Sequence, residues 1–221
     1  MFFELNGENL LDKKPKAPYY ECRTLEGRDT MKGTHEHERS RSVRQTRQSL
    51  SLALIQLLNE KPLQAITVRE LTRKAGVSRG TFYFHYCDIY DLLEQLEQEQ
   101  LDQLARLMDA LLPRLNDETP PEALRLLYEY LDENDDVCRA LLGEHSTGEF
   151  ILRLEQSAAE RWLAFYAAQG VPVDRRRYRI AFAVHGCLGC VAAWLRMDKT
   201  VPIAEMAELT WQSIRAVQLT P

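Results

Sequence analysis

The stretch from Thr67 to Tyr86, TVRELTRKAGVSRGTFYFHY, constrains the fold most because it contains two helix starts and a tight turn. Thr67 is a residue type that caps a helix N-terminus, and Glu70, three residues later, completes a capping box. Gly76 can adopt a positive φ that ends this first helix, and Ser78 can cap a second one. Two short helices joined so tightly must cross at a steep angle, which predicts a helix-turn-helix.

The second of these helices has an outer face suited to DNA. Phe82 and Tyr86 lie four residues apart and are expected to face inward. The opposite side carries a glycine that permits close approach, an arginine that suits a guanine edge, and donors that suit phosphate oxygens. Together with the two caps, the candidate DNA-binding residues of this stretch are Thr67, Ser78, Arg79, Gly80, Thr81, Tyr83 and His85.

The sequence RGTFYFHY, followed by DIYDLLEQL, resembles the recognition helix and the next helix start of the TetR family of transcription regulators. The resemblance extends from about Val43 to Gln103, and the DIYDLLE motif is typical of one branch of the family. It implies an all-α fold with an N-terminal three-helix DNA-binding domain at 43–103 and a C-terminal helical domain at 104–221. It further implies a homodimer on palindromic double-stranded DNA, with a small-molecule effector bound by the C-terminal domain.

The helices on either side of this motif can be predicted from the spacing of apolar residues. From Ser42 to Asn59 they recur at three and four positions, which predicts an amphipathic helix. Arg44 and Arg47 in that helix are candidate DNA contacts, with ordinary surface charge as the alternative. After the motif, Asp88 is expected to cap a helix that runs to Pro113 and spans roughly 37 Å, long enough to connect the DNA-binding domain to the remainder.

The remaining chain is predicted to be helical, apart from its N-terminal end. Residues 1–38 have no sustained period and mix charges of both signs, so they are predicted to form a disordered arm. Beyond the long helix no strand signal is present. Five further helices are expected at about 120–134, 135–142, 147–169, 174–196 and 202–217.

Charge is unevenly distributed along the chain. The net charge is −5, which by itself does not favour DNA as a partner. Between Arg39 and Thr81, however, nine basic residues face two acidic ones, so this segment carries +7 and the remainder −12. This polarity is typical of a protein that presents one end to phosphates.

The composition predicts a soluble cytoplasmic protein without a membrane partner. Hydrophobic residues make up 45% of the chain, but we expect no apolar run to reach the length that spans a bilayer. The N-terminal MFFELNGENLLDKK lacks the apolar core of a signal peptide. Five cysteines, an odd number without a framework spacing, favour free thiols over disulfides.

Two groups of residues in the C-terminal half are candidate binding surfaces. Aromatic side chains on its middle helices either line a ligand cavity or form plain core. They are Tyr128, Phe150, Trp162, Phe165, Tyr166, Tyr178 and Phe182. A stripe of small residues on the helix at 174–196, with apolar residues on the last helix, is expected to form the dimer interface. These residues are Gly186, Gly189, Ala193, Met206 and Leu209.

The segment HGCLGC, which contains Cys187 and Cys190, has the C-x-x-C spacing of a metal or thiol-redox site. It lies within an apolar helical stretch without a second ligand pair, which favours buried small residues over a site. No metal, cofactor or enzymatic activity is expected, because no phosphate-binding glycine loop, zinc-hydrolase motif or nucleophile elbow is present.

The sequence therefore predicts a sequence-specific DNA-binding regulator that acts as an effector-responsive homodimeric repressor. Two alternatives remain open: a DNA-binding adaptor whose C-terminal half binds a protein partner, and a thiol or metal sensor that uses Cys187 and Cys190.

Overall fold

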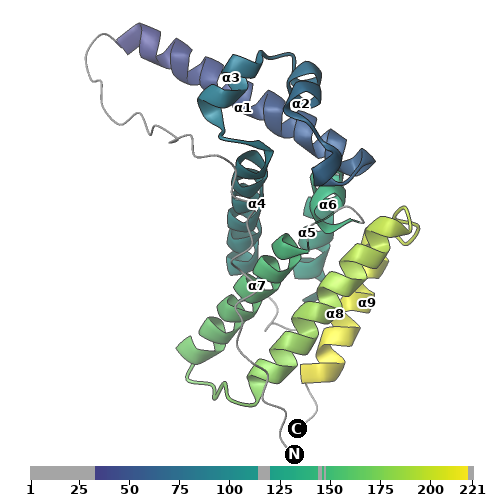
Figure 1. Ribbon diagram of the computed structural model, residues 1–221. Coiled ribbons are helices and arrows are strands. Elements are labelled where there is room, and N and C mark those ends of the chain that lie inside the picture. Colours follow the sequence, from purple (N-terminus) through teal and green to yellow (C-terminus); the bar gives the residue numbers. More distant parts are fainter. Residues whose placement is uncertain (1–32, 114–119, 144–145, 147, 219–221) are drawn as a thin grey trace, which may run out of the picture.

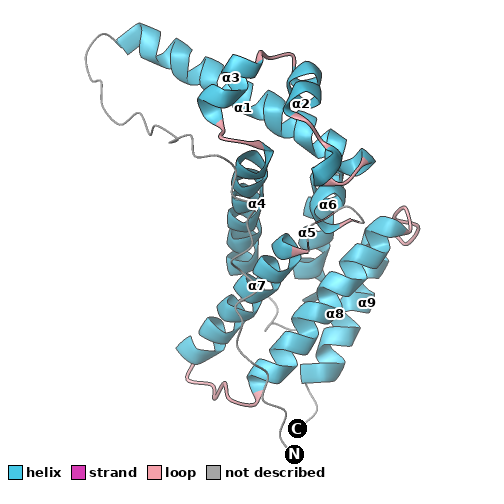
Figure 2. Cartoon of the chain, in the orientation of Figure 1, coloured by secondary structure: helices cyan, strands magenta, loops and turns pink. Residues whose placement is uncertain are grey.

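The computed structural model describes residues 33–113, 120–143, 146 and 148–218. In this part of the chain all regular structure is helical (Figure 2), which confirms the predicted all-α fold. A short 3-10 turn at Leu63–Ala65 lies between α1 and α2. The α-helices are α1 Gly33–Glu60, α2 Val68–Ala75, α3 Arg79–His85, α4 Ile89–Leu111, α5 Pro120–Glu133, α6 Asp135–Leu142, α7 Glu149–Ala168, α8 Arg176–Arg196 and α9 Ile203–Gln218.

The first helix begins earlier than the sequence pattern predicted. α1 starts at Gly33 rather than Ser42, so the last residues of the expected disordered arm, 33–38, are helical. Their side chains are charged or polar and carry no apolar period, so a search for a buried face cannot detect them. The rest of the predicted arm, 1–32, lies outside the described residues.

The helix-turn-helix has the predicted caps. The hydroxyl of Thr67 accepts a hydrogen bond from the Glu70 N–H at 3.2 Å, and that of Ser78 accepts one from the Thr81 N–H at 3.0 Å. Gly76 ends α2 with a φ of 69°, a conformation that glycine adopts without steric cost. These three features place α3 across α2 at the outer end of the molecule (Figure 1).

We call α1, α2 and α3 the head; its core continues into the rest of the protein. Leu54, Leu71 and Phe82 are fully buried in the head, and one contiguous apolar cluster joins them to α4, α6 and α7. The contributions from α6 and α7 are Ala140, Leu141, Phe150 and Leu154. We call α5 to α9 the body, and α4 descends from the head into it (Figure 1).

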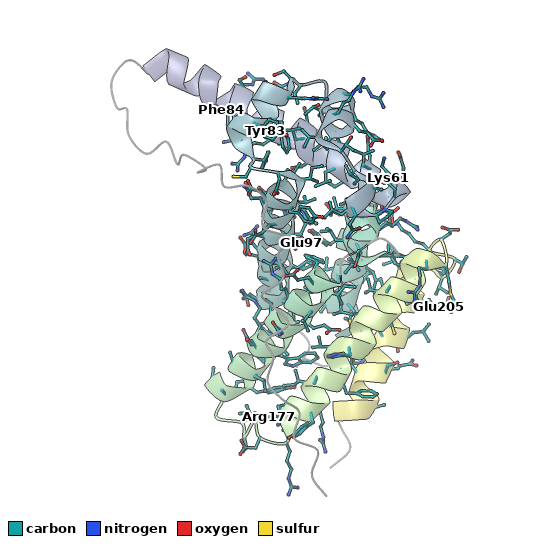
Figure 3. All side chains as sticks on the ribbon, in the orientation of Figure 1. Lys61, Tyr83, Phe84, Glu97, Arg177 and Glu205 are labelled. Atoms are coloured by element: carbon teal, nitrogen blue, oxygen red, sulfur yellow. The ribbon has the colours of Figure 1, made fainter. Side chains whose placement is uncertain are left out.

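Two polar links hold the head and α4 against the body. The side-chain amide of Asn59 in α1 donates to the backbone carbonyl of Asp136 in α6 at 2.9 Å. Arg153 of α7 forms an ion pair with the buried Glu97 of α4 at 3.1 Å and donates to Gln98 at 2.7 Å. Burial raises the pKa of Glu97, while the charge of Arg153 opposes that shift. Figure 3 shows Glu97 below the head, where α4 enters the body.

In the body, α5 packs on α9, and α8 packs on both α7 and α9. Tyr128 of α5 and Thr210 of α9 are both fully buried and share a hydrogen bond of 2.8 Å between their hydroxyl oxygens. The ring of Trp194 in α8 meets that of Tyr128 edge to face, with centroids 5.2 Å apart. α8 and α9 lie side by side at one edge of the molecule (Figure 1).

α8 departs from one expectation of the sequence analysis. It is long and apolar enough to cross a membrane, by length and composition only. A core helix of a soluble protein meets the same criterion, and α8 buries one side against the body core. The buried residues are Ile180, Ala183, Val184, Val191, Trp194 and Leu195. Its other side carries apolar residues that this chain alone leaves exposed.

The pair Tyr128 and Thr210 yields a stability prediction. Tyr128→Phe leaves the Thr210 hydroxyl buried without its partner, so the free energy of unfolding should fall by about 1 to 3 kcal/mol. In Tyr128→Phe/Thr210→Val both hydroxyls are absent, and the double variant should lose less than the sum of the two single variants. Urea unfolding of all four proteins measures the coupling. Strict additivity would show that the hydroxyls do not stabilise one another.

Candidate DNA interface and ligand cavity

The outer face of α3 is formed by Arg79, Gly80, Tyr83 and Phe84, which are all exposed. Tyr83 and Phe84 are exposed to 59% and 68%, and Figure 3 shows both at the surface of the head. Phe82, on the opposite side of the helix, is fully buried. The sequence analysis did not assign Phe84 to this face, although its position, four residues after Gly80, could have done so.

The hydroxyl groups predicted to contact DNA are used within the head. Ser78 and Thr81 share a hydrogen bond of 2.8 Å between their side-chain oxygens, in addition to the backbone cap. Thr67 caps α2 in the same manner. The primary effect of these three side chains is therefore to fix where α2 and α3 begin.

Gly80 has no structural reason to be glycine within this chain. A Cβ atom added there would meet only the Ser78 hydroxyl, at an ordinary contact distance of 3.6 Å. Its φ is not positive, and the position is the second residue of α3. The absence of a side chain instead leaves the outer surface of α3 open to a close-approaching molecule.

Arg47 is exposed and connects α1 with the start of α4. Its guanidinium lies over the ring of Tyr86, 5.8 Å from the centroid, and donates to the side chain of Gln95. Gln95 donates in turn to Asp91, which accepts the backbone N–H of Cys87 at 2.8 Å. Arg47 thus positions the head on α4, and like Arg44 it is exposed.

His85 lies near Arg47 and is half-buried. Partial burial, and then the nearby charge of Arg47, lower the pKa of His85. The ring therefore stays neutral at neutral pH and can offer one N–H to a phosphate oxygen.

The exposed positive charge of the head is carried by arginine. Lys61 pairs with Glu70 at 2.6 Å, and Lys74 with Glu60 at 2.8 Å. The hydrogen bond from Lys61 lowers the pKa of Glu70 most. Both glutamates of the segment are thereby neutralised, and the exposed arginines are Arg41, Arg44, Arg47, Arg69, Arg73 and Arg79. The sequence analysis counted Arg69 and Arg73 in the charge of the segment but not among the candidate contacts.

A cavity of about 120 Å³ lies in the body directly below the head. Helices α4 to α9 enclose it, and its walls are almost wholly apolar. Of the aromatic residues predicted to line a cavity, Phe150 and Trp162 do so. The other wall residues come mainly from α4 to α8 and include Gln100, Leu104, Met108, Leu127, Tyr130, Leu141, Leu154, Ala158, Cys187, Leu188 and Val191.

Five predicted pocket residues lie elsewhere. Tyr128 is buried against α9, Phe165 packs on the body core, and Tyr166 is covered by the guanidinium of Arg176 at 5.0 Å. Tyr178 and Phe182 are exposed to 76% and 66%, so they are outside the cavity. Their side of α8 faces away from α7 and α9, a direction that helical spacing alone does not reveal.

The predicted dimer residues lie mostly on that exposed side. Gly186 and Gly189 are exposed, and a Cβ atom built at either one has no neighbour within 4 Å. Leu209 on α9 is exposed to 46%, and Ala193 is half-buried. Met206 differs, because it is buried in the core of the body.

The cysteines near the cavity are thiols, of which Cys138 is buried and Cys187 is half-buried. Cys187 and Cys138 line the cavity, and burial raises the pKa of each to about 12. A neutral thiol is a poor nucleophile and a poor metal ligand. Among the described residues, no group of three or more His, Cys, Asp and Glu side chains could hold a metal ion. Cys87 is disulfide-bonded, contrary to the expectation of free thiols throughout.

Comparison with known families matches both halves of the chain. The family described as "Bacterial regulatory proteins, tetR family" matches residues 52–96, and the family described as "Transcriptional regulator C-terminal region" matches residues 118–216. The two ranges together cover more than half of the chain.

Curated relatives share parts of the sequence. The uncharacterized HTH-type transcriptional regulator YxbF of Bacillus subtilis is 37% identical over 59 residues, which are 26% of this chain and 16% of that protein. The HTH-type transcriptional regulator EthR of Mycobacterium tuberculosis is 28% identical over 121 residues, 51% of this chain and 54% of EthR. The chain thus spans at most about half the length of these relatives.

Solved structures share the fold. A TetR transcriptional regulator from Streptococcus agalactiae matches 81% of this chain and 98% of its own, with a TM-score of 0.57 and 21% identity. The regulator FadR from Bacillus subtilis, solved in complex with stearoyl-CoA, matches 76% of this chain and 96% of its own, with a TM-score of 0.57 and 16% identity.

Gly80 provides a prediction that separates binding from folding. In Gly80→Ala the fold should be as stable as the parent or more stable, by up to about 1 kcal/mol, because alanine favours the helix and meets no clash. Affinity for specific DNA should fall about tenfold or more, because the added methyl group obstructs close approach. Fluorescence anisotropy with a labelled duplex measures the affinity, and thermal unfolding of the same samples is the control. Unchanged affinity would remove Gly80 from the interface.

Proposed function

The chain belongs to the TetR family of bacterial transcription regulators, a family without enzymatic activity, and we propose that it is an effector-responsive repressor. DNA binding through the helix-turn-helix is the activity of this family. The proposal adds that two copies bind a palindromic operator in the cytoplasm, and that a small molecule in the body cavity releases them. The proposed DNA contacts are Arg44, Arg47, Arg79, Gly80, Tyr83, Phe84 and His85, with Thr67, Ser78 and Thr81 holding the helix starts.

The position of the cavity is the observation that carries the effector response. Leu141, Phe150 and Leu154 belong to the apolar cluster of the head and also line the cavity. Leu188 of α8 packs against the clusters of both head and body. A molecule that occupies the cavity therefore touches side chains that also support the head.

Helix α4 offers a direct route from the cavity to α3. Gln100, Leu104 and Met108 form one wall of the cavity at four-residue spacing, and the N-terminal end of α4 follows α3 after a short turn. Two recognition helices must be about 34 Å apart, or a multiple of it, to enter successive major grooves. A ligand that tilts α4 would change this separation in a dimer and so lower operator affinity.

A structural relative supports a small-molecule effector. FadR was solved in complex with stearoyl-CoA, so a protein of the same fold binds a small molecule. Of the two alternatives, the thiol or metal sensor is disfavoured because the raised pKa of Cys187 keeps its thiol neutral. The adaptor would require a protein partner in place of the cavity ligand.

The test of the proposed function uses purified full-length protein. Specific duplexes are selected from a random pool and footprinted, and we expect a protected palindrome with two half-sites. Small molecules are then screened for release of that duplex. A single unsymmetric half-site would contradict the homodimer, and release only by a protein partner would favour the adaptor.

The dimer proposal rests on the exposed face of α8. Tyr178, Phe182, Gly186 and Gly189 leave an apolar side uncovered in one chain, and a second copy of α8 and α9 would cover it. Gly186→Leu has free space within the chain, so the variant should fold but obstruct the partner.

We expect parent protein to sediment as a dimer at micromolar concentration and Gly186→Leu to sediment as a monomer that binds the palindrome at least tenfold more weakly. The matched control is Ala110→Leu, which adds a similar side chain to an exposed position of α4. A dimeric Gly186→Leu protein with parental operator affinity would place the interface elsewhere.

A further inference from the structure

We propose that Phe84 recognises a thymine of the operator by packing its ring against the 5-methyl group of that base in the major groove. This inference rests on the proposed function, because it names the base that one residue on the outer face of α3 contacts. Three features of α3 support it: the exposure of the ring, the charges around it, and the close approach that Gly80 permits.

The ring of Phe84 is not part of the core. It is exposed to 68% and lies at the surface of the head (Figure 3). Its one ring contact in the described part of the chain is with His85, edge to face, with centroids 5.0 Å apart. Phe82 is fully buried and anchors α3 to the core. Phe84 therefore gains burial only from a molecule that covers it from outside.

The surroundings of the ring suit DNA. Arg79 is exposed on the same face of α3, and the charge of Arg47 acts on His85, the neighbour of Phe84. The sequence of α3, RGTFYFH, contains no acidic residue. An apolar protein partner would cover these guanidinium groups without a counter-charge, at a cost in free energy, whereas DNA supplies phosphates beside its bases.

Gly80 places the ring inside the groove. Gly80 and Phe84 are four residues apart, so they share one face of the helix and are separated by about 6 Å along its axis. A Cβ atom at Gly80 would meet only the Ser78 hydroxyl, so the backbone of α3 can approach another molecule closely there. The major groove is about 12 Å wide and 8.5 Å deep, enough for a helix. With Gly80 close to the DNA, the projecting ring of Phe84 reaches the base edges.

The chemistry of the ring selects thymine. In the major groove guanine, adenine and cytosine present hydrogen-bonding atoms, and thymine alone adds a methyl group. A phenyl ring can neither donate to nor accept from a polar edge, and it would exclude the water that otherwise satisfies that edge. Phe84 therefore favours thymine, while Arg79 suits the two acceptor atoms of guanine.

Deoxyuridine tests the contact, because it replaces the thymine methyl group by hydrogen and leaves base pairing unchanged. Each thymine of a half-site in the selected palindrome is replaced in turn, and fluorescence anisotropy measures the affinity of the full-length protein. We expect one position at which the parent protein loses about fourfold in affinity, the effect of one buried methyl group.

Phe84→Ala connects this loss to the ring. The variant should bind the thymine duplex about tenfold more weakly than the parent, and should bind the thymine and deoxyuridine duplexes equally at the position found. Its response to the other thymines should be unchanged, which a general distortion of α3 would not produce. Because the ring is exposed, thermal unfolding should match the parent. The matched control is Leu152→Ala in α7, where an exposed apolar side chain is shortened far from α3, and it should behave as the parent in both measurements.

The proposal is overturned if no deoxyuridine substitution weakens binding by the parent, or if Phe84→Ala keeps the parental loss at the same position. Either result, obtained on a selected palindrome, would leave the proposed repressor intact and remove only the thymine contact. Failure to select any specific duplex would instead contradict the proposed function, and this inference with it.

Discussion

The arrangement of this protein depends on one continuous apolar contact between the head and the helices beneath it. Phe82 of α3 is fully buried in the same cluster as Phe150 and Leu154 of α7. Because close-packed side chains do not deform gradually, a change on one side of such a cluster is transmitted as a shift of whole helices. The cavity lies beside this contact, since Phe150 and Leu154 also line it.

Polar contacts give that arrangement its specific register. The hydrogen bond from Asn59 to Asp136 fixes α1 on α6, and the ion pair between Arg153 and Glu97 fixes α7 on α4. A buried carboxylate costs free energy unless its partner stays in place, so the Glu97 pair is broken only if α4 and α7 separate. Apolar burial supplies most of the attraction between these helices, and the polar pairs select one relative position from many of similar burial.

The local chemistry of the head was predictable from sequence, whereas the orientation of helix faces in the body was not. Thr67, Gly76 and Ser78 determine their caps through contacts within three residues, and the structure has all three. The early start of α1 escaped prediction because residues 33–41 have no apolar period. In α8 apolar residues occur on every side, so nothing in the pattern separates Phe182, which is exposed, from Val184, which is buried.

The two lysine–glutamate pairs of the head have a consequence for the conditions under which it holds DNA. With Lys61 and Lys74 paired, the positive field around α3 comes from guanidinium groups. Arginine keeps its proton throughout the range in which lysine and histidine titrate. Since His85 is already neutral at neutral pH, the attraction of this surface for phosphate should change little as the pH rises above neutrality. A DNA-binding surface built in this way responds to salt and is largely indifferent to a rise in the pH of its surroundings.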